Sequence, residues 1–584
     1  MKDNFKWVTI LFCFLGIGAP MGIVPGEEDP VLMRMAPEEV LMYASWAGTQ
    51  AADPDGNATE KWIAQKDMQR FWSDMGTKLQ RLATAAIENS DDDPALGQLY
   101  ALSLKLPKLL CRQPCGFYID QLSKNGKDYG GVLVINLGER KDEIAEQLKK
   151  AKASIKESIK LTHEHGTDWL VSDADAWLLP SLKTKIGIHE RYLVIGFSGG
   201  ECELNVSSFF ENKDTPEPKW LTKIKQKLPV PRRASVGYVN TPLAVRALEG
   251  LEADVKTIGF VNGLDDEGYL GRVWIEGGDE SEFAKVINGP IEKKLWEKMP
   301  AGNLFTATAC ISKEEMFKAV KSVSNNDPMF EELIANFEAF GDGVTLKDEL
   351  MSNIGDNIFV IGEAHSLGLW GTNTNPSGLC LQVKDEMGFL DTIEGFAKRL
   401  KEVSEDTENF TIETKVIEEV KVYLVTRKRR SAGWRKIYFA LHNSQLVVVN
   451  NLKLLKKVLF TEELDEKQRW VKAKRVNRLY QYANDQKLGE PNLLFEVDPK
   501  PILQTGHGLS GLLVSYGLAK VPDVGTMTNG LEPCLTGVFK TEDGFQIVQQ
   551  NVLPSGTPPS FLGFAAVIAN ALSVQSKLQI IQKK

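Results

Sequence analysis

The chain has 584 residues, a formal net charge of −9 at pH 7, 43% hydrophobic residues and 25% charged residues. That length exceeds one ordinary hydrophobic core, so at least two domains are expected. The composition is globular and excludes a disordered, collagen-like or multi-span membrane chain. Nucleic acid is not expected as a partner, because no basic surplus is available to neutralise phosphates.

The first 26 residues have the pattern of a secretory signal peptide. Two lysines precede an apolar run from Trp7 to Val24, and Gly18 or Gly22 could supply a cleavage point. An uncleaved N-terminal anchor is the alternative, and it would associate the chain with a membrane. We predict an extracytoplasmic protein of the periplasm or cell envelope, or a secreted one. Residues 25–30 are expected to form a linker.

Two stretches of the chain correspond to each other. Residues 183–209 and 436–459 each predict a strand, a two-residue polar turn, an apolar strand, a tight turn and a helix. Without gaps, Leu193 faces Leu446, an offset of 446 − 193 = 253. Each leucine opens the most apolar strand of its stretch, so we expect both to point into a core.

Further matches follow the same order along the chain. They comprise strands at 38–47 and 302–310, strand–helix pairs at 131–150 and 378–400, strands entering helices at 235–248 and 492–503, and hairpins at 257–275 and 534–552. We therefore predict an α+β fold, a tandem duplication of an antiparallel-sheet module with helices on one face. The predicted modules are residues 30–297 and 298–555. An amphipathic helix at 67–87 has a possible counterpart at 329–340.

The C-terminal residues 556–584 predict one amphipathic helix. Their longest uninterrupted apolar run, Phe561 to Ala569, is too short to cross a bilayer. Apolar residues nevertheless recur every three or four positions and draw a single stripe along the helix. We expect that stripe to dock on protein.

The cysteines indicate at most one disulfide. Cys111 and Cys115 flank Arg-Gln-Pro, and in an oxidising compartment they could form a small disulfide loop. Their spacing is neither the usual redox spacing nor that of a zinc site. The remaining cysteines beyond the leader border apolar strands, where a buried free thiol acts as a small hydrophobe; these are Cys202, Cys310, Cys380 and Cys534.

One catalytic motif occurs. Gly196-Phe197-Ser198-Gly199-Gly200 follows a predicted strand and matches the nucleophile elbow of serine hydrolases. The second stretch has Asn451 where the first has Ser198, and it makes the same turn without a nucleophile. A hydrolase would also need a histidine, an acid and a parallel sheet, which the hairpins do not indicate. We prefer to explain these glycines by the turn.

Two patterns could hold a metal ion. His163 and His165 alternate as strand ligands would, but no third ligand is evident, so we interpret them as solvated loop residues. Asp53 and Asp55 resemble part of a calcium loop, with Glu60 as a further possible ligand, but lack its full spacing, so a turn is preferred. No phosphate loop, dinucleotide fingerprint or zinc framework occurs, and no cofactor is expected.

Several sequence segments together resemble those of a known family. A secretory leader, the segment PEEVLMYASWAG at 37–48, the stretch from Asn57 to Glu60 ahead of an amphipathic helix, and duplicated strand–helix modules resemble large exported proteins of planctomycete-type bacteria. Those proteins carry domains of unknown function. The resemblance implies an extracytoplasmic, non-enzymatic protein and brings no catalytic residues with it.

We therefore expect a structural, interaction or binding protein whose partner is a protein or an apolar ligand. The alternative is an exported serine hydrolase that uses Ser198.

Overall fold

The computed structural model describes residues 24–553, apart from several segments. The segments left out are 71–108, 111, 124–127, 154–158, 173–181, 244–254, 279–281, 288, 298, 315–351, 364–375, 408–409, 428–435, 461–468, 502 and 505–522. The predicted signal peptide, nearly all of the predicted helix at 67–87, its counterpart at 329–340 and the C-terminal helix lie outside the described residues.

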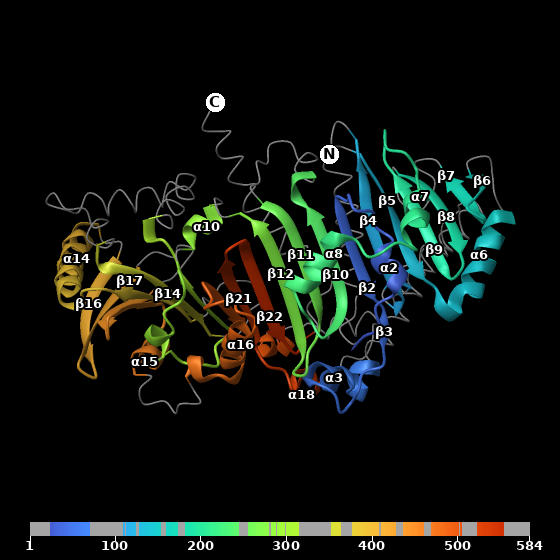
Figure 1. The fold of residues 1–584 in the computed structure, drawn as a ribbon. Helices are drawn as coiled ribbons and strands as arrows, with labels where there is room; N and C mark the ends of the chain where they lie inside the picture. The colour runs from blue at the N-terminus through green and yellow to red at the C-terminus, as the bar shows by residue number, and fades with distance from the viewer. Residues whose placement is uncertain are drawn as a thin grey trace. The chain divides into compact units, whose positions relative to one another are not determined.

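The chain mixes helices and antiparallel strands, as an α+β fold requires, and its contacts divide it into two units (Figure 1). Unit 1 comprises residues 1–278, 507–531 and 543–584, and unit 2 comprises residues 279–506 and 532–542. Residues 279–297, which we assigned to the first module, therefore make their contacts in unit 2, where the N–H of Ile291 donates to the carbonyl of Pro491.

Apart from a separate two-stranded sheet of β1 (Val24–Pro25) and β3 (Thr49–Gln50), the described strands of unit 1 pair antiparallel in one continuous order. From one edge this order is β6 (Ile159–Glu164), β7 (Thr167–Ser172), β8 (Lys183–His189), β9 (Tyr192–Ser198), β5 (Tyr129–Asn136), β4 (Pro114–Leu122), β2 (Met42–Ala47), β10 (Arg232–Asn240), β11 (Val255–Leu264), β12 (Tyr269–Gly277) and β22 (Gly544–Asn551). The helices of unit 1 are α2 (Pro30–Arg34), α3 (Ala58–Ile63), α6 (Lys141–Ala153), α7 (Ser207–Asn212), α8 (Lys219–Lys227) and α18 (Val524–Thr528).

Unit 2 is also an antiparallel sheet. Its order is β16 (Phe410–Ile417), β17 (Val420–Arg427), β18 (Lys436–His442), β19 (Gln445–Val449), β15 (Ser377–Val383), β14 (Ile354–Gly362), β13 (Phe305–Cys310), β20 (Leu493–Val497) and β21 (Cys534–Thr541). Its helical elements are α10 (Glu282–Val286), η2 (Lys293–Trp296), α14 (Glu386–Thr407), α15 (Leu452–Leu459), η5 (Trp470–Lys472) and α16 (Lys474–Asp485).

Hairpin turns with left-handed backbone join consecutive strands in both units. The β6–β7 turn has φ of 53° at His165 and 68° at Gly166, and the β16–β17 turn has φ of 50° at Glu418 and 70° at Glu419. Two-residue turns of this kind match the right-handed twist of antiparallel strands, which explains why they recur where the strands are short and continuous.

Both predicted core leucines are buried, which confirms that expectation. Leu193 is fully buried beside Ile135 and Ile195. Leu446 is 9% exposed and belongs to a core cluster with Phe389. Each lies in a central strand that pairs on both sides, so its inward face is covered.

Helices cover one sheet face closely where a glycine makes room for them. A Cβ atom on Gly259 of β11 would lie 2.9 Å from Cγ1 of Ile224 in α8, and one on Gly537 of β21 would lie 2.9 Å from Cδ2 of Leu479 in α16. Real Cβ contacts are not that short. The two glycines therefore set how closely α8 and α16 approach their own sheets.

The predicted linker at 25–30 is ordered structure, so that expectation was wrong. Val24 and Pro25 form β1, which pairs with β3 (Thr49–Gln50), and Val24 is fully buried. Asp29 is 5% exposed and caps α2 by accepting the N–H of Val31 at 2.8 Å. Proline and acidic residues resemble a linker in sequence, but here proline begins a helix and the acid caps it.

Among the described helices, none combines the length and hydropathy needed to cross a bilayer.

Candidate functional site

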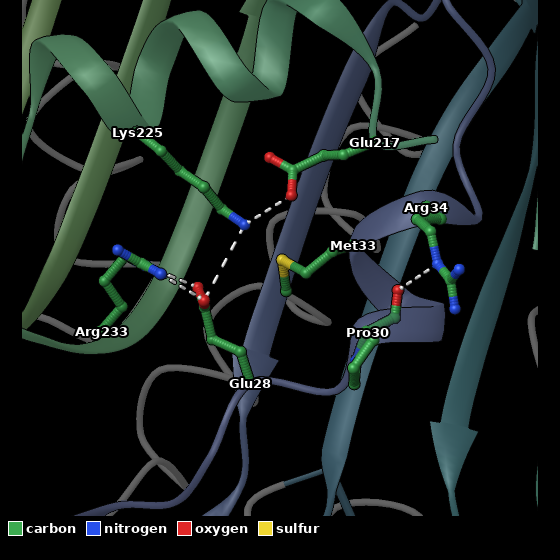
Figure 2. Close-up of a pocket in the computed structure, with 7 residues that line it drawn as sticks. All are labelled: Glu28, Pro30, Met33, Arg34, Glu217, Lys225 and Arg233. Atoms are coloured by element: carbon green, nitrogen blue, oxygen red, sulfur yellow. Dashed lines mark hydrogen bonds and ion pairs between the residues drawn. The ribbon is translucent and has the colours of Figure 1, made fainter. Parts of the chain in front are cut away.

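A groove of about 440 Å³ lies between α2 and α8 in unit 1 (Figure 2). Its lining is Glu28, Pro30, Met33, Arg34, Glu217, Lys225 and Arg233. The volume is within the usual range for small-molecule sites. The lining contains three cations and two carboxylates but no serine, cysteine or histidine, so its chemistry favours binding over nucleophilic catalysis.

The wall formed by α2 is held by buried hydrogen bonds. The Asp29 carboxylate accepts from Tyr192 Oη at 3.2 Å and from Asn136 Nδ2 at 2.5 Å. Tyr43 Oη donates to the carbonyl of Leu32 at 2.9 Å. Desolvation raises the pKa of Tyr43 far above its usual value, so its hydroxyl remains a donor. These bonds fix the short helix that presents Met33 and Arg34.

The opposite wall is formed by α8, which aromatic side chains hold in place. Trp220 stacks on Tyr238 of β10 with ring centroids 4.5 Å apart, and Tyr43 meets the same indole edge-on at 5.1 Å. Trp220 Nε1 donates to the carbonyl of Pro37 at 3.3 Å. Contacts of this kind leave α8 little freedom to move away from β10.

The charged wall neutralises itself. Arg233 donates to both oxygens of Glu28, at 2.9 and 2.7 Å. Lys225 lies 3.0 Å from Glu217 and 3.8 Å from Glu28 (Figure 2). The hydrogen bonds to Glu28 raise the pKa of Arg233, which keeps the pair ionised. Two cations and two carboxylates therefore cancel along this wall.

Arg34 carries the remaining charge. Its Nε donates to the carbonyl of Pro30 at 3.0 Å, and the described residues show no further hydrogen bond or ion pair for its guanidinium (Figure 2). Met33, only 5% exposed, places its thioether between Arg34 and the neutralised wall. The groove thus combines one uncompensated positive charge with the apolar side chains of Pro30 and of the nearly buried Met33.

Ser198 does not have the environment of an elbow nucleophile. It is the last residue of β9, pairs antiparallel with Gly130 and Lys183, and is fully buried. Its Oγ has no hydrogen-bond partner among the described residues. The next helix, α7, begins only at Ser207. An elbow instead exposes its serine on a sharp turn from a parallel strand into a helix.

The two candidate metal histidines are both solvent-exposed in a hairpin, where His165 lies in the turn as expected and His163 lies on a strand and not in a loop. His163 is on β6 and bonds Asp168 of β7 at 2.8 Å, and His165 begins the turn and stacks on Phe210 at 4.4 Å. The hydrogen bond from His163, followed by that from Lys152, lowers the pKa of Asp168. Among the described residues, no group of three His, Cys, Asp or Glu side chains could hold a metal ion.

Another histidine, His189, is more enclosed. Lys213 Nζ donates to its Nε2 at 2.9 Å, so Nδ1 carries the proton and donates to Thr167 Oγ1 at 3.1 Å. Desolvation, followed by the charge of Lys213, lowers the pKa of His189, so the imidazole stays neutral near pH 7. These contacts fasten the β6–β7 tip to α7, a structural task.

Asp53 and Asp55 form a turn ahead of α3. Asp53 Oδ1 accepts the N–H of Asp55 at 2.9 Å, and Asn57 and Glu60 form a capping box. Glu60 also pairs with Arg232 at 3.0 Å. The oxygens that could have bound calcium are thus used by a turn, a cap and an ion pair.

Cys111 lies outside the described residues, so its disulfide with Cys115 stays a prediction. Cys115 is buried, with its thiol 3.6 Å from the carbonyl of Leu110. Cys380 is fully buried, and desolvation raises its pKa to about 12, as expected for an inert thiol in a core.

Sequence reasoning missed the groove altogether. Its residues come from two stretches of the chain, one from the supposed linker into α2 and one from just before α8 into β10, and these stretches are far apart in the sequence. The signal in the sequence was the acidic dipeptide Glu28-Asp29 and the basic dipeptide Arg232-Arg233, whose opposite charges could have suggested an ion pair between the two segments.

Comparison with known proteins adds little. No family model and no curated protein matches the chain. Among solved structures, crystal form I of TP0453 is similar over 43% of this chain and 80% of that chain, with 11% sequence identity and a TM-score of 0.22. A likeness that slight assigns neither fold nor function.

Proposed function

We propose that the chain is an exported, two-module binding protein without catalytic activity. The observation that carries this proposal is the groove of unit 1, which has ligand-sized volume, fixed walls and a charge to recognise a partner, but no nucleophile in its lining. The predicted partner class, a protein or an apolar ligand, is thereby extended to a molecule that also carries charge.

Tandem duplication is part of the proposal, and the strand orders support it. From β6 to β11 and from β16 to β21, each unit runs through the same succession of hairpins and crossovers. Registers agree in detail, since Met42 faces Val239 and Phe305 faces Val497. The left-handed turns and the glycines beneath α8 and α16 correspond as well.

Export is the other part of the proposal, and the sequence of residues 1–26 supports it. A charged start, an apolar run and small residues are typical of a signal peptide. The resemblance to exported proteins of planctomycete-type bacteria agrees with that location. If the leader is kept, it would tether the binding modules to a membrane.

Export can be tested with a reporter that is active only outside the cytoplasm. Fused to residues 1–26, the reporter should become active, because the apolar run directs secretion. A matched fusion with Leu11, Leu15 and Ile17 replaced by Asp should stay inactive. Equal activity of the two fusions, or none from either, would refute the extracytoplasmic location.

The class of function can be tested by activity-based labelling. A fluorophosphonate probe should not label the purified protein above the level seen with the Ser198→Ala variant, because the Ser198 hydroxyl is fully buried. Stoichiometric labelling that disappears in that variant would instead establish the hydrolase.

A further inference from the structure

Unit 2 carries an aromatic side chain at the position that matches Met33 of the groove in unit 1. β2 and β13 correspond at an offset of 305 − 42 = 263, which the strand registers support. The same offset relates Met33 to Trp296. On the helix side, α8 and α16 begin 474 − 219 = 255 residues apart. By that offset Trp470, in η5 directly before α16, corresponds to Thr215, two residues before Glu217.

In unit 2 these positions hold aromatic side chains. Trp296 and Trp470 are each at most 1% exposed, and their rings lie 5.2 and 5.4 Å from that of Phe359. Phe359 faces Thr308 across β14 and β13. Three large rings from three elements therefore pack together at this place, as a hydrophobic core does.

In unit 1 all three rings are missing. Gly116 faces Ser45, the counterpart of Thr308, and so occupies the position of Phe359 without a side chain. Met35 partly fills that space, since a Cβ on Gly116 would lie 2.7 Å from its methyl group. Met33 and Thr215 stand in place of the tryptophans. Of these positions only Met33 lines the groove, so a methionine lies there at the position that an indole ring occupies in unit 2.

We propose that this groove binds a small organic molecule with one carboxylate and an apolar body, an inference that rests on the binding function proposed above. Arg34 offers a planar guanidinium fork, which matches the two oxygens of a carboxylate. Pro30 and Met33 supply apolar surface beside it. Lys225 and Arg233 are already paired with Glu217 and Glu28, so the lining offers one uncompensated cation, and the second charge of a phosphate dianion would have no partner there.

Benzoate is a suitable probe, because it carries both groups and is far smaller than the groove. Calorimetric titration of the purified protein with benzoate should show binding, and the Met33 methyl signal should shift in a protein labelled with [¹³C-methyl]methionine, assigned through Met33→Leu. Benzamide, which has the same body without the charge, should bind roughly tenfold more weakly or not at all. Inorganic phosphate should not shift the Met33 signal.

Three variants separate recognition from folding. Arg34→Gln should weaken benzoate binding roughly tenfold with an unchanged melting temperature, because Arg34 makes one hydrogen bond within the described residues. Arg140→Gln, which removes a partly exposed arginine outside the groove, should bind as the parent does. Met33→Trp, which imitates Trp296, should block the groove.

The inference is overturned if benzoate leaves the Met33 signal unmoved, if benzamide binds equally well, or if Arg34→Gln binds like the parent. Export and the labelling result are independent of these titrations. If the protein is exported, is not modified by the fluorophosphonate probe and does not bind benzoate, the proposed ligand class is disproved, whereas the proposed binding function is not.

Discussion

Leu193→Ala should lower the free energy of unfolding by about 2–5 kcal/mol, because a fully buried leucine loses its transfer free energy and leaves a cavity. Leu193 packs within the cluster that includes Ile135, Ile186 and Ile195, all at most 1% exposed. β9 is paired on both sides, so the backbone has little freedom to collapse into the space. Leu446→Ala should fall at the low end of that range, since Leu446 retains 9% exposure.

Urea denaturation followed by circular dichroism measures both effects. Leu161→Ala is the matched control, because Leu161 is 49% exposed on the edge strand β6 and should change stability by less than about 0.5 kcal/mol. If the two buried leucines shift the midpoint no more than Leu161 does, then β9 and β19 are not core strands.

The second large effect is expected at a buried ion pair in unit 2. Arg475 donates to both oxygens of Glu496, each at 2.7 Å, and Trp470 Nε1 donates to the same carboxylate at 3.2 Å. Glu496 is 1% exposed. Arg475→Leu would leave a buried carboxylate without its cation, which costs about 3–5 kcal/mol. Thermal unfolding of this variant should show that loss.

The double variant Arg475→Leu/Glu496→Leu tests the cause. The tandem duplication proposed above would place Glu496 at the position of Tyr238 and Arg475 at that of Trp220, where unit 1 holds an aromatic stack in place of an ion pair. The double variant should recover most of the lost stability, because a well-packed apolar pair can replace a buried ion pair. If the double variant is as unstable as Arg475→Leu, the loss is one of packing and not of charge.

Local patterns in the sequence predicted much of the fold. Alternating apolar residues placed β8, β9, β18 and β19, and the hairpin tips at Asp266–Gly268 and Glu542–Gly544 lie between the expected strands. These features depend on neighbours in the chain, through turn chemistry and the two-residue repeat of a strand. For the same reason they could be recognised twice in one chain.

Sequence patterns gave wrong predictions at residues whose role depends on whether they are buried. Gly-Phe-Ser-Gly-Gly has the letters of an elbow, but β9 lies between two antiparallel neighbours that bury Ser198. The proline-rich start resembled a linker, although Val24 and Asp29 are buried. A sequence motif specifies residue types and spacing, whereas access to solvent depends on what packs on top.

The sequence by itself determined the mixed helix and strand class, the antiparallel hairpins and the burial of the core leucines, because strand periodicity and turn preference are properties of a few consecutive residues. Only the tertiary structure decided where a ligand could bind. Met33 is far along the chain from Lys225 and Arg233, and these residues meet because α2 and α8 pack on the same sheet. Whether the groove is open or filled depends on the combined volume of side chains from α2, α8 and β10, which no pattern of consecutive residues specifies.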